Sequence, residues 1–155
     1  NHFVKNYQFT YGSIAPQDKT ACLRLYRRWM RMRRQYEHDR LYTGMASDTL
    51  ACLAFLFSHW RDFDLQARVV KVDGAIKAFT IGCRVSADIF CISHEITDLS
   101  IKGLSQFIFS SFARDLAGYA YLNIMDDSGL ENLKNVEMRY HPSRMGPAFI
   151  AQRAQ

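Results

Sequence analysis

Residues 119–144, YAYLNIMDDSGLENLKNVEMRYHPSR, contain the pattern from which the fold is predicted. The stretch opens with a short, mostly apolar and aromatic run, which predicts a strand because it is too short for a buried helix. It turns on Asp-Asp-Ser-Gly and enters a helix that must end by His141, since Pro142 disfavours the α conformation of the residue before it. Asn123 and Asp127 therefore stand near the free N–H groups of a helix N-terminus, where chemistry is common. Helix capping is the simpler role for Asp127, and both interpretations stay open.

A β-hairpin and a third strand come before this stretch. Residues 67–72 and 75–81 are joined by Asp73-Gly74, and Asp-Gly between apolar runs is a strong hairpin signal. Residues 87–93 predict a third strand of the same antiparallel sheet, and a loop is expected over residues 94–102.

A long helix is predicted over residues 101–116. Its apolar residues recur at helical spacing and form one stripe: Ile101, Leu104, Ile108, Phe112 and Leu116. We expect Phe112 and Leu116 to be almost fully buried against the sheet. Because this helix connects the 87–93 strand to the 120–125 strand, the two strands are expected to be parallel neighbours joined by a right-handed crossover.

The N-terminal part predicts a strand over residues 7–11 and a helix over residues 16–36. After a break at Gly44, Ser47 or Asp48 can cap a second helix, which is apolar over most of its circumference and is expected to be deeply packed. Residues 146–152 can form a last strand. The order of elements predicts an α+β domain with a mixed sheet flanked by helices.

The first long helix carries basic residues opposite its apolar side, namely Arg24, Arg27, Arg28, Arg31 and Arg34. No acidic residue lies between the first and the last of them. A solvated face is the usual meaning of such a run. Like charges one turn apart cost helix stability, however, so a polyanionic partner such as RNA is the functional alternative.

The composition excludes several classes of protein. The chain has 155 residues, is 48% hydrophobic and carries a formal net charge of +5, as expected of one globular domain rather than a disordered chain. Its four cysteines are widely spaced among apolar neighbours, which predicts reduced, buried thiols in the cytoplasm. No metal-ligand spacing, transmembrane run or secretory signal is visible. The initial Asn1 favours an excised piece of a longer protein.

The order of elements and several short motifs resemble the GNAT superfamily of N-acyltransferases. In detail the second half is similar to the C-terminal domain family of bacterial phosphatidylglycerol lysyltransferase, which transfers lysine from lysyl-tRNA to a lipid. The residues that carry the resemblance are Ser93-His94-Glu95, Gly103-Leu-Ser-Gln106, Phe112, Tyr121-Leu-Asn123, Asp127-Ser-Gly129, Leu133-Lys134 and Tyr140-His141-Pro142. The resemblance implies that residues 1–155 are one GNAT-like domain, the C-terminal half of a tandem pair, with a preceding GNAT-like domain as partner.

The resemblance also implies a donor-binding loop before the 101–116 helix. GNAT proteins bind the pyrophosphate of acyl-CoA there, on backbone N–H groups that a glycine leaves accessible. The signature is present here in a weak form, as Ser100, Gly103 and Ser105. An aminoacyl-tRNA donor would need no such loop, so both acyl-CoA and aminoacyl-tRNA are considered as donors.

Four residues are the implied catalytic set: Glu95, Asn123, Asp127 and Tyr140. Glu95 would act as general base on the incoming amine and Tyr140 as acid for the leaving group, if both face the notch that GNAT folds open between two parallel strands. Met125 and Glu137 replace an acidic residue and a lysine of the family pattern. Two functions are therefore weighed, an acyl- or aminoacyl-transferase and a non-catalytic domain that binds RNA or a partner domain through its arginine helix.

Overall fold

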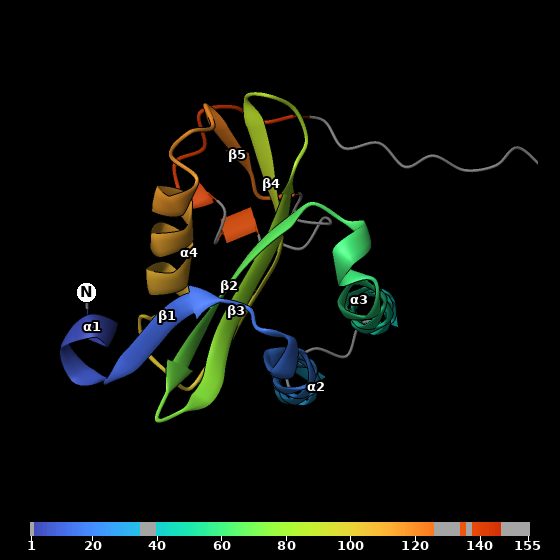
Figure 1. Cartoon of the computed structure of the whole chain (residues 1–155), viewed down its shortest axis with the longest axis vertical. Helices are drawn as coiled ribbons and strands as arrows, with labels where there is room; N and C mark the ends of the chain where they lie inside the picture. Colours follow the sequence, from blue (N-terminus) through green and yellow to red (C-terminus); the bar gives the residue numbers. More distant parts are fainter. Residues whose placement is uncertain (1, 35–39, 126–133, 136–137, 147–155) are drawn as a thin grey trace, which may run out of the picture. The chain divides into compact units, whose positions relative to one another are not determined.

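The computed structural model describes residues 2–34, 40–125, 134–135 and 138–146. The chain forms two compact units, Asn1–Asn123 and Ile124–Gln155. In the first unit the described residues form a five-stranded sheet in the order β1-β2-β3-β4-β5 (Figure 1). Its principal elements are α1 (His2–Asn6), β1 (Phe9–Ser13), α2 (Lys19–Arg34), α3 (Arg40–Ser58), β2 (Leu65–Val72), β3 (Ala75–Arg84), β4 (Ile89–Thr97), α4 (Leu104–Asp115) and β5 (Tyr121–Asn123).

The predicted hairpin is confirmed. Strands β2 and β3 pair antiparallel up to Val72 and Ala75. The two residues between them both have positive φ, 51° at Asp73 and 76° at Gly74. Two consecutive residues with positive φ make the turn whose twist matches that of the flanking strands, which explains why Asp-Gly is found here.

The predicted parallel pair is confirmed as well. Strand β5 lies beside β4 and runs parallel to it, with Ile89 opposite Tyr121 and Cys91 opposite Asn123. Helix α4 connects the two strands, as the sequence pattern predicts. The helix begins at Leu104 rather than at residue 101, because Gly103 adopts a left-handed conformation with φ 82° and serves as its N-cap.

Two helical layers cover the two faces of this sheet. Helices α2 and α3 lie on one side and α1 and α4 on the other (Figure 1). The α2–α3 side is centred on Tyr26, Leu53 and Phe79. On the α4 side, Phe112 is 0% and Leu116 2% exposed, which confirms their predicted burial. The Phe112 ring meets that of Phe90 edge to face, with 5.8 Å between ring centroids.

Strand β4 is longer than predicted and contains a bulge. The register of β3 and β4 shifts between Ile81, which pairs with His94, and Gly82, which pairs with Ile92. Ser93 is therefore the extra residue of β4, and its hydroxyl donates a hydrogen bond to the Ile81 carbonyl oxygen at 3.1 Å. The predicted loop over residues 94–102 is wrong in its first part, because β4 continues to Thr97. Glu95 accordingly lies in a strand and does not cap a loop.

The predicted start and packing of the second helix are also wrong. Helix α3 begins at Arg40 and passes through Gly44, so Ser47 and Asp48 lie inside it. A single glycine costs a helix only about 1 kcal/mol, which tertiary contacts can offset. One such contact is the hydrogen bond from the Tyr26 hydroxyl to the Ala46 carbonyl oxygen at 2.9 Å. The packing is one-sided, since Leu53 is buried whereas Phe55 is 53% exposed.

The cysteines differ from the prediction in their burial. All four are free thiols, as expected, and Cys22 and Cys91 are buried. Cys83 is half-buried and Cys52 is exposed on α3. The predicted helix that follows Asp-Asp-Ser-Gly and ends by His141 lies largely outside the described residues, as does the last strand at residues 146–152 except for its first residue. Among described residues no helix has both the length and the apolarity needed to cross a bilayer.

Candidate active site

The candidate site lies where β5 ends and β4 continues. The parallel pair ends with Asn123 beside Cys91, whereas β4 runs on to Thr97. In the described part of the chain, residues 92–97 of β4 therefore have a strand neighbour on the β3 side alone. We call this segment the open edge of β4. It lies where the resemblance implies the notch that GNAT folds open between two parallel strands.

Glu95 is the central residue of the open edge. One of its carboxylate oxygens, Oε1, accepts a hydrogen bond from the Ser105 hydroxyl of α4 at 3.2 Å. The other oxygen, Oε2, is buried and has no hydrogen-bond partner among the described residues. Burial raises the pKa of Glu95 to about 7 from its ordinary value of 4.5, although the hydrogen bond from Ser105 opposes the rise. A carboxyl with this pKa exchanges its proton near neutral pH, as a general base must.

Thr80 of β3 stands directly opposite Glu95 in the register of the two strands. Its hydroxyl oxygen is buried and, within the described chain, has no hydrogen-bond partner either. Side chains directly opposite on one face of a sheet have Cβ atoms about 5 Å apart. Two buried oxygens without a partner in the described chain thus occupy paired positions, and such groups are uncommon unless a ligand or water completes them.

The bulge at Ser93 explains why Glu95 faces α4. Side chains alternate along a strand, and one extra residue exchanges the faces of all that follow. His94, opposite Ile81, takes the α2–α3 face, and Glu95 takes the other. His94 is itself half-buried, and this burial lowers its pKa; its Nδ1 lies 3.0 Å from the Ser93 hydroxyl.

The other predicted catalytic residues are not gathered around Glu95 by the described structure. Asn123 pairs with Cys91, four residues before Glu95 on β4. At a rise of about 3.3 Å per residue the two lie roughly 13 Å apart along the strand. Asp127 lies outside the described residues, and Tyr140 belongs to the second compact unit. The roles of these three residues stay predictions.

Hydrogen bonds within the predicted donor loop engage several of its own donors. The backbone N–H and the hydroxyl of Ser100 both donate to Asp98 Oδ1, at 3.2 and 2.6 Å. The N–H groups of Ile101 and Leu104 donate to carbonyl oxygens within the loop, at 3.1 and 3.3 Å. The Ser105 hydroxyl is engaged by Glu95. The N–H groups of Ser100, Ile101 and Leu104 are therefore already engaged within the protein.

The chain resembles known proteins in sequence and in fold. The family described as "Phosphatidylglycerol lysyltransferase, C-terminal" matches residues 1–152. The chain belongs to this family. No curated protein sequence matches it.

Solved structures show the same fold. A conserved protein of unknown function from Bacteroides thetaiotaomicron superimposes with a TM-score of 0.81 at 25% identity, over 94% of this chain and 48% of that one. A possible acetyltransferase from Clostridium difficile gives 0.68 at 10% identity, over 95% and 98%. Ribosomal-protein-alanine N-acetyltransferase from Brucella melitensis biovar Abortus gives 0.64 at 12% identity, over 94% and 100%. The lysyltransferase C-terminal family domain thus has a GNAT-like, acyltransferase-like fold and spans about half of the Bacteroides structure.

The arginine face of α2 is exposed as predicted, with Arg24, Arg27, Arg28, Arg31 and Arg34 on the solvent side. Within the described chain, an ion pair is found for one of the five: Arg28 Nη1 lies 3.4 Å from Asp98 Oδ2. Whether the face binds a polyanion stays a prediction.

Sequence reasoning missed three polar residues around these sites: Thr80, Lys77 and Asp98. Thr80 has no sequence signal, because its importance depends on the β3–β4 register. Asp98 is a buried acid 1% exposed at its side chain, and it accepts from Lys77 Nζ at 3.1 Å. An isolated acid directly after a strand could have been suspected of a capping role, and its contact with Ser100 is of that kind.

Proposed function

We propose that this domain carries an acyl- or aminoacyl-transferase site at the open edge of β4, with Glu95 as general base. The observation that supports it most is the state of the Glu95 carboxyl: Oε2 is buried without a hydrogen-bond partner among the described residues, and the pKa is raised to about 7. A structural carboxylate would have its oxygens satisfied by neighbours. The reaction class is supported by the fold and by the family.

The proposed chemistry moves one acyl group. The acceptor amine or hydroxyl attacks the carbonyl carbon of the donor, and Glu95 takes the proton that the acceptor loses. The bond between the acyl carbon and the leaving group then breaks, and the leaving oxygen or sulfur receives a proton. Tyr140 is the proposed acid for that proton, and Asn123 and Asp127 are proposed to orient the donor.

We propose aminoacyl-tRNA rather than acyl-CoA as the donor class, and a lipid or other amine or hydroxyl as the acceptor. The internal hydrogen bonds of the loop before α4 support this choice, because they occupy the N–H groups of Ser100, Ile101 and Leu104. Such a donor would place the reaction in the cytoplasm. A preceding GNAT-like domain is the proposed partner, in line with the Bacteroides structure, of which this chain covers 48%.

The test is a transfer assay on the full-length protein with lysyl-tRNA and vesicles containing phosphatidylglycerol, and in parallel with acetyl-CoA and a primary amine. Glu95→Gln should lower the transfer rate by about 10²–10⁴-fold. The wild-type rate should rise with pH through about 7, because the base acts in its ionised form. Asp62→Asn, which removes an exposed carboxylate, is the control and should keep full activity. Wild-type rates in Glu95→Gln would contradict the proposal.

The second candidate function is binding of RNA by the arginine face, supported by its exposure and by the single ion pair found for its five arginines within the described chain. Arg28 is left out of the test, because reversing its charge would place two acids together at the buried Asp98. The charge-reversed triple variant of Arg27, Arg31 and Arg34 should bind RNA more weakly and with a shallower salt dependence, about one unit of slope per lost phosphate contact.

The control is the charge-matched triple variant of three exposed cations outside α2: Lys5, Arg84 and Lys102. Equal affinities of wild type and the α2 variant, or equal losses in both variants, would leave the arginine face as an ordinary solvated surface.

A further inference from the structure

A cavity lies beside α2, away from Glu95. It has a volume of about 350 Å³ and is bounded by α2, by the β2–β3 turn at Gly74 and by the residues that follow the turn. Its lining includes three cations, Arg24, Arg28 and Lys77, and two acids, Asp18 and Asp98. The volume is within the range of small-ligand sites.

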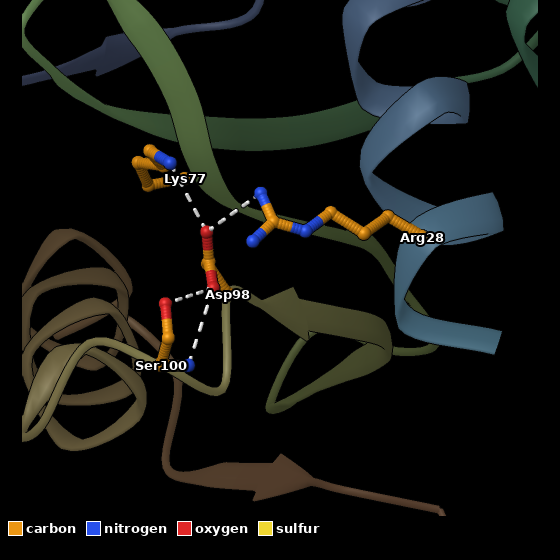
Figure 2. Close-up of polar contacts among 4 residues, drawn as sticks. All are labelled: Arg28, Lys77, Asp98 and Ser100. Carbon is orange, nitrogen blue, oxygen red and sulfur yellow. Dashed lines mark hydrogen bonds and ion pairs between the residues drawn. The ribbon is translucent and has the colours of Figure 1, made fainter. Parts of the chain in front are cut away.

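Both acids of the cavity are already engaged by the protein. Asp98 is held between Arg28 and Lys77 on one side and Ser100 on the other (Figure 2). Burial alone would raise the pKa of Asp98, but the hydrogen bonds from Ser100 and Lys77 and the charge of Arg28 lower it below its ordinary value. Asp18, whose side chain is 8% exposed, pairs with Lys71 Nζ at 2.7 Å. Neither carboxylate therefore needs a further cation.

The cations of the cavity keep unused hydrogen-bond donors. Arg24 is exposed and forms no ion pair within the described part of the chain. Arg28 makes one long contact of 3.4 Å, although a guanidinium has five N–H donors. Lys77 Nζ makes one contact with Asp98. A compact anion with several oxygens can accept hydrogen bonds from several of these donors at once. Phosphate is such an anion.

We propose that this cavity is a binding site for the phosphate group of a ligand, with Arg24 and Arg28 as direct contacts and Lys77 at its inner wall. Asp98 is a positioning residue, because one buried carboxylate brings Arg28 from α2 and Lys77 from β3 to the same side of the cavity. The inference is independent of the transferase proposal. It rests partly on the arginine-face proposal. It restricts the phosphate contacts to part of that face, since Arg31 and Arg34 belong to the face and do not line the cavity.

The test compares Arg24→Gln with Arg31→Gln in the full chain. Both variants remove one exposed charge from α2, and neither residue has an ion pair in the described chain, so neither should change the melting temperature. The probe is inorganic pyrophosphate at fixed ionic strength, followed by the backbone amide signals of Gly74, Ala75 and Lys77. Arg24→Gln should raise the dissociation constant about tenfold or more, and Arg31→Gln less than twofold.

Two further probes carry the same group on different molecules, namely adenosine 5′-monophosphate and vesicles containing phosphatidylglycerol. If one of them binds more strongly than pyrophosphate and this binding is again lost in Arg24→Gln, the result supports a phosphate site in the cavity. It also identifies the ligand as a nucleotide or a lipid. Equal losses in both variants would overturn the cavity and leave a diffuse arginine face. Absence of binding by all three probes would overturn the cavity site itself.

Discussion

At the scale of single residues, the Glu95 carboxyl sets a pH dependence of stability. Its pKa in the folded protein is raised to about 7, above the ordinary 4.5. Between these values the folded state keeps a proton that the unfolded state has lost, so the contribution of Glu95 to the free energy of unfolding falls as pH rises through this window and is constant above it. The free energy of unfolding of Glu95→Gln minus that of wild type should therefore increase by up to about 3 kcal/mol from pH 4 to pH 8.

Urea unfolding of both proteins at the two pH values measures this difference. Asp62→Asn is the control, because it removes one exposed carboxylate elsewhere on the chain. A stability difference between Glu95→Gln and wild type that is the same at pH 4 and pH 8 would show that Glu95 titrates normally.

Thr80 gives a second prediction at this scale. Its buried hydroxyl has no partner in the described chain, so the fold bears the cost of removing it from water. Thr80→Val keeps the shape and removes the polar group, and it should leave stability unchanged or raise it by about 1 kcal/mol. The control is Thr49→Val, where the lost hydroxyl donates to the Met45 carbonyl oxygen at 2.9 Å. A clear loss of stability in Thr80→Val would mean that the hydroxyl is satisfied.

At the scale of elements, α4 is fixed to the sheet by its buried stripe. Phe112 is 0% exposed and packs against Phe90. Phe112→Ala should lower the free energy of unfolding by about 3–5 kcal/mol, because it leaves a cavity under the helix. The exposed Gln106→Ala on the same helix should change it by less than about 0.5 kcal/mol. Urea unfolding measures both, and similar values for the two would mean that the buried face is assigned wrongly.

The bulged pairing of β3 and β4 depends on Gly82. A Cβ at this position would collide with the Cys91 carbonyl oxygen and with the ring of Phe90. Since one obstacle is backbone, Gly82→Ala must move β4, at a cost of about 1–3 kcal/mol or more. Gly12→Ala in β1 is the matched control, because its Cβ would meet nothing within 4 Å. Thermal unfolding distinguishes them, and equal melting temperatures would contradict the close approach.

At the level of the whole molecule, the sequence predicts those features that depend on residues close together in the chain. The Asp73-Gly74 turn, the parallel pair around α4 and the burial of Phe112 all follow from spacing and turn residues. The bulge at Ser93 does not, because serine carries no bulge signal and the shift arises from pairing with β3. For the same reason the sequence indicates Glu95 as a candidate base, but it does not predict that Glu95 lies in a strand or that Thr80 stands opposite it.

Long-range pairs are the second limit of the sequence. Arg28 and Asp98 meet across the fold, and nothing in either segment indicates the other. The start of α3 before Gly44 is a related case, because contacts with α2 outweigh the weak helix preference of one glycine. The sequence therefore supplies the fold and the candidate base, and the tertiary structure supplies what surrounds them.

We expect the fold to prepare Glu95 to exchange a proton near neutral pH. The most direct test is a ¹³C NMR titration of the Glu95 side-chain carboxyl, assigned by comparison with Glu95→Gln, in wild type and in Ser105→Ala. We predict a midpoint near pH 7 in wild type and a higher one in Ser105→Ala, because the hydrogen bond from Ser105 lowers the pKa. A wild-type midpoint near the ordinary value of 4.5, unchanged in Ser105→Ala, would contradict the claim.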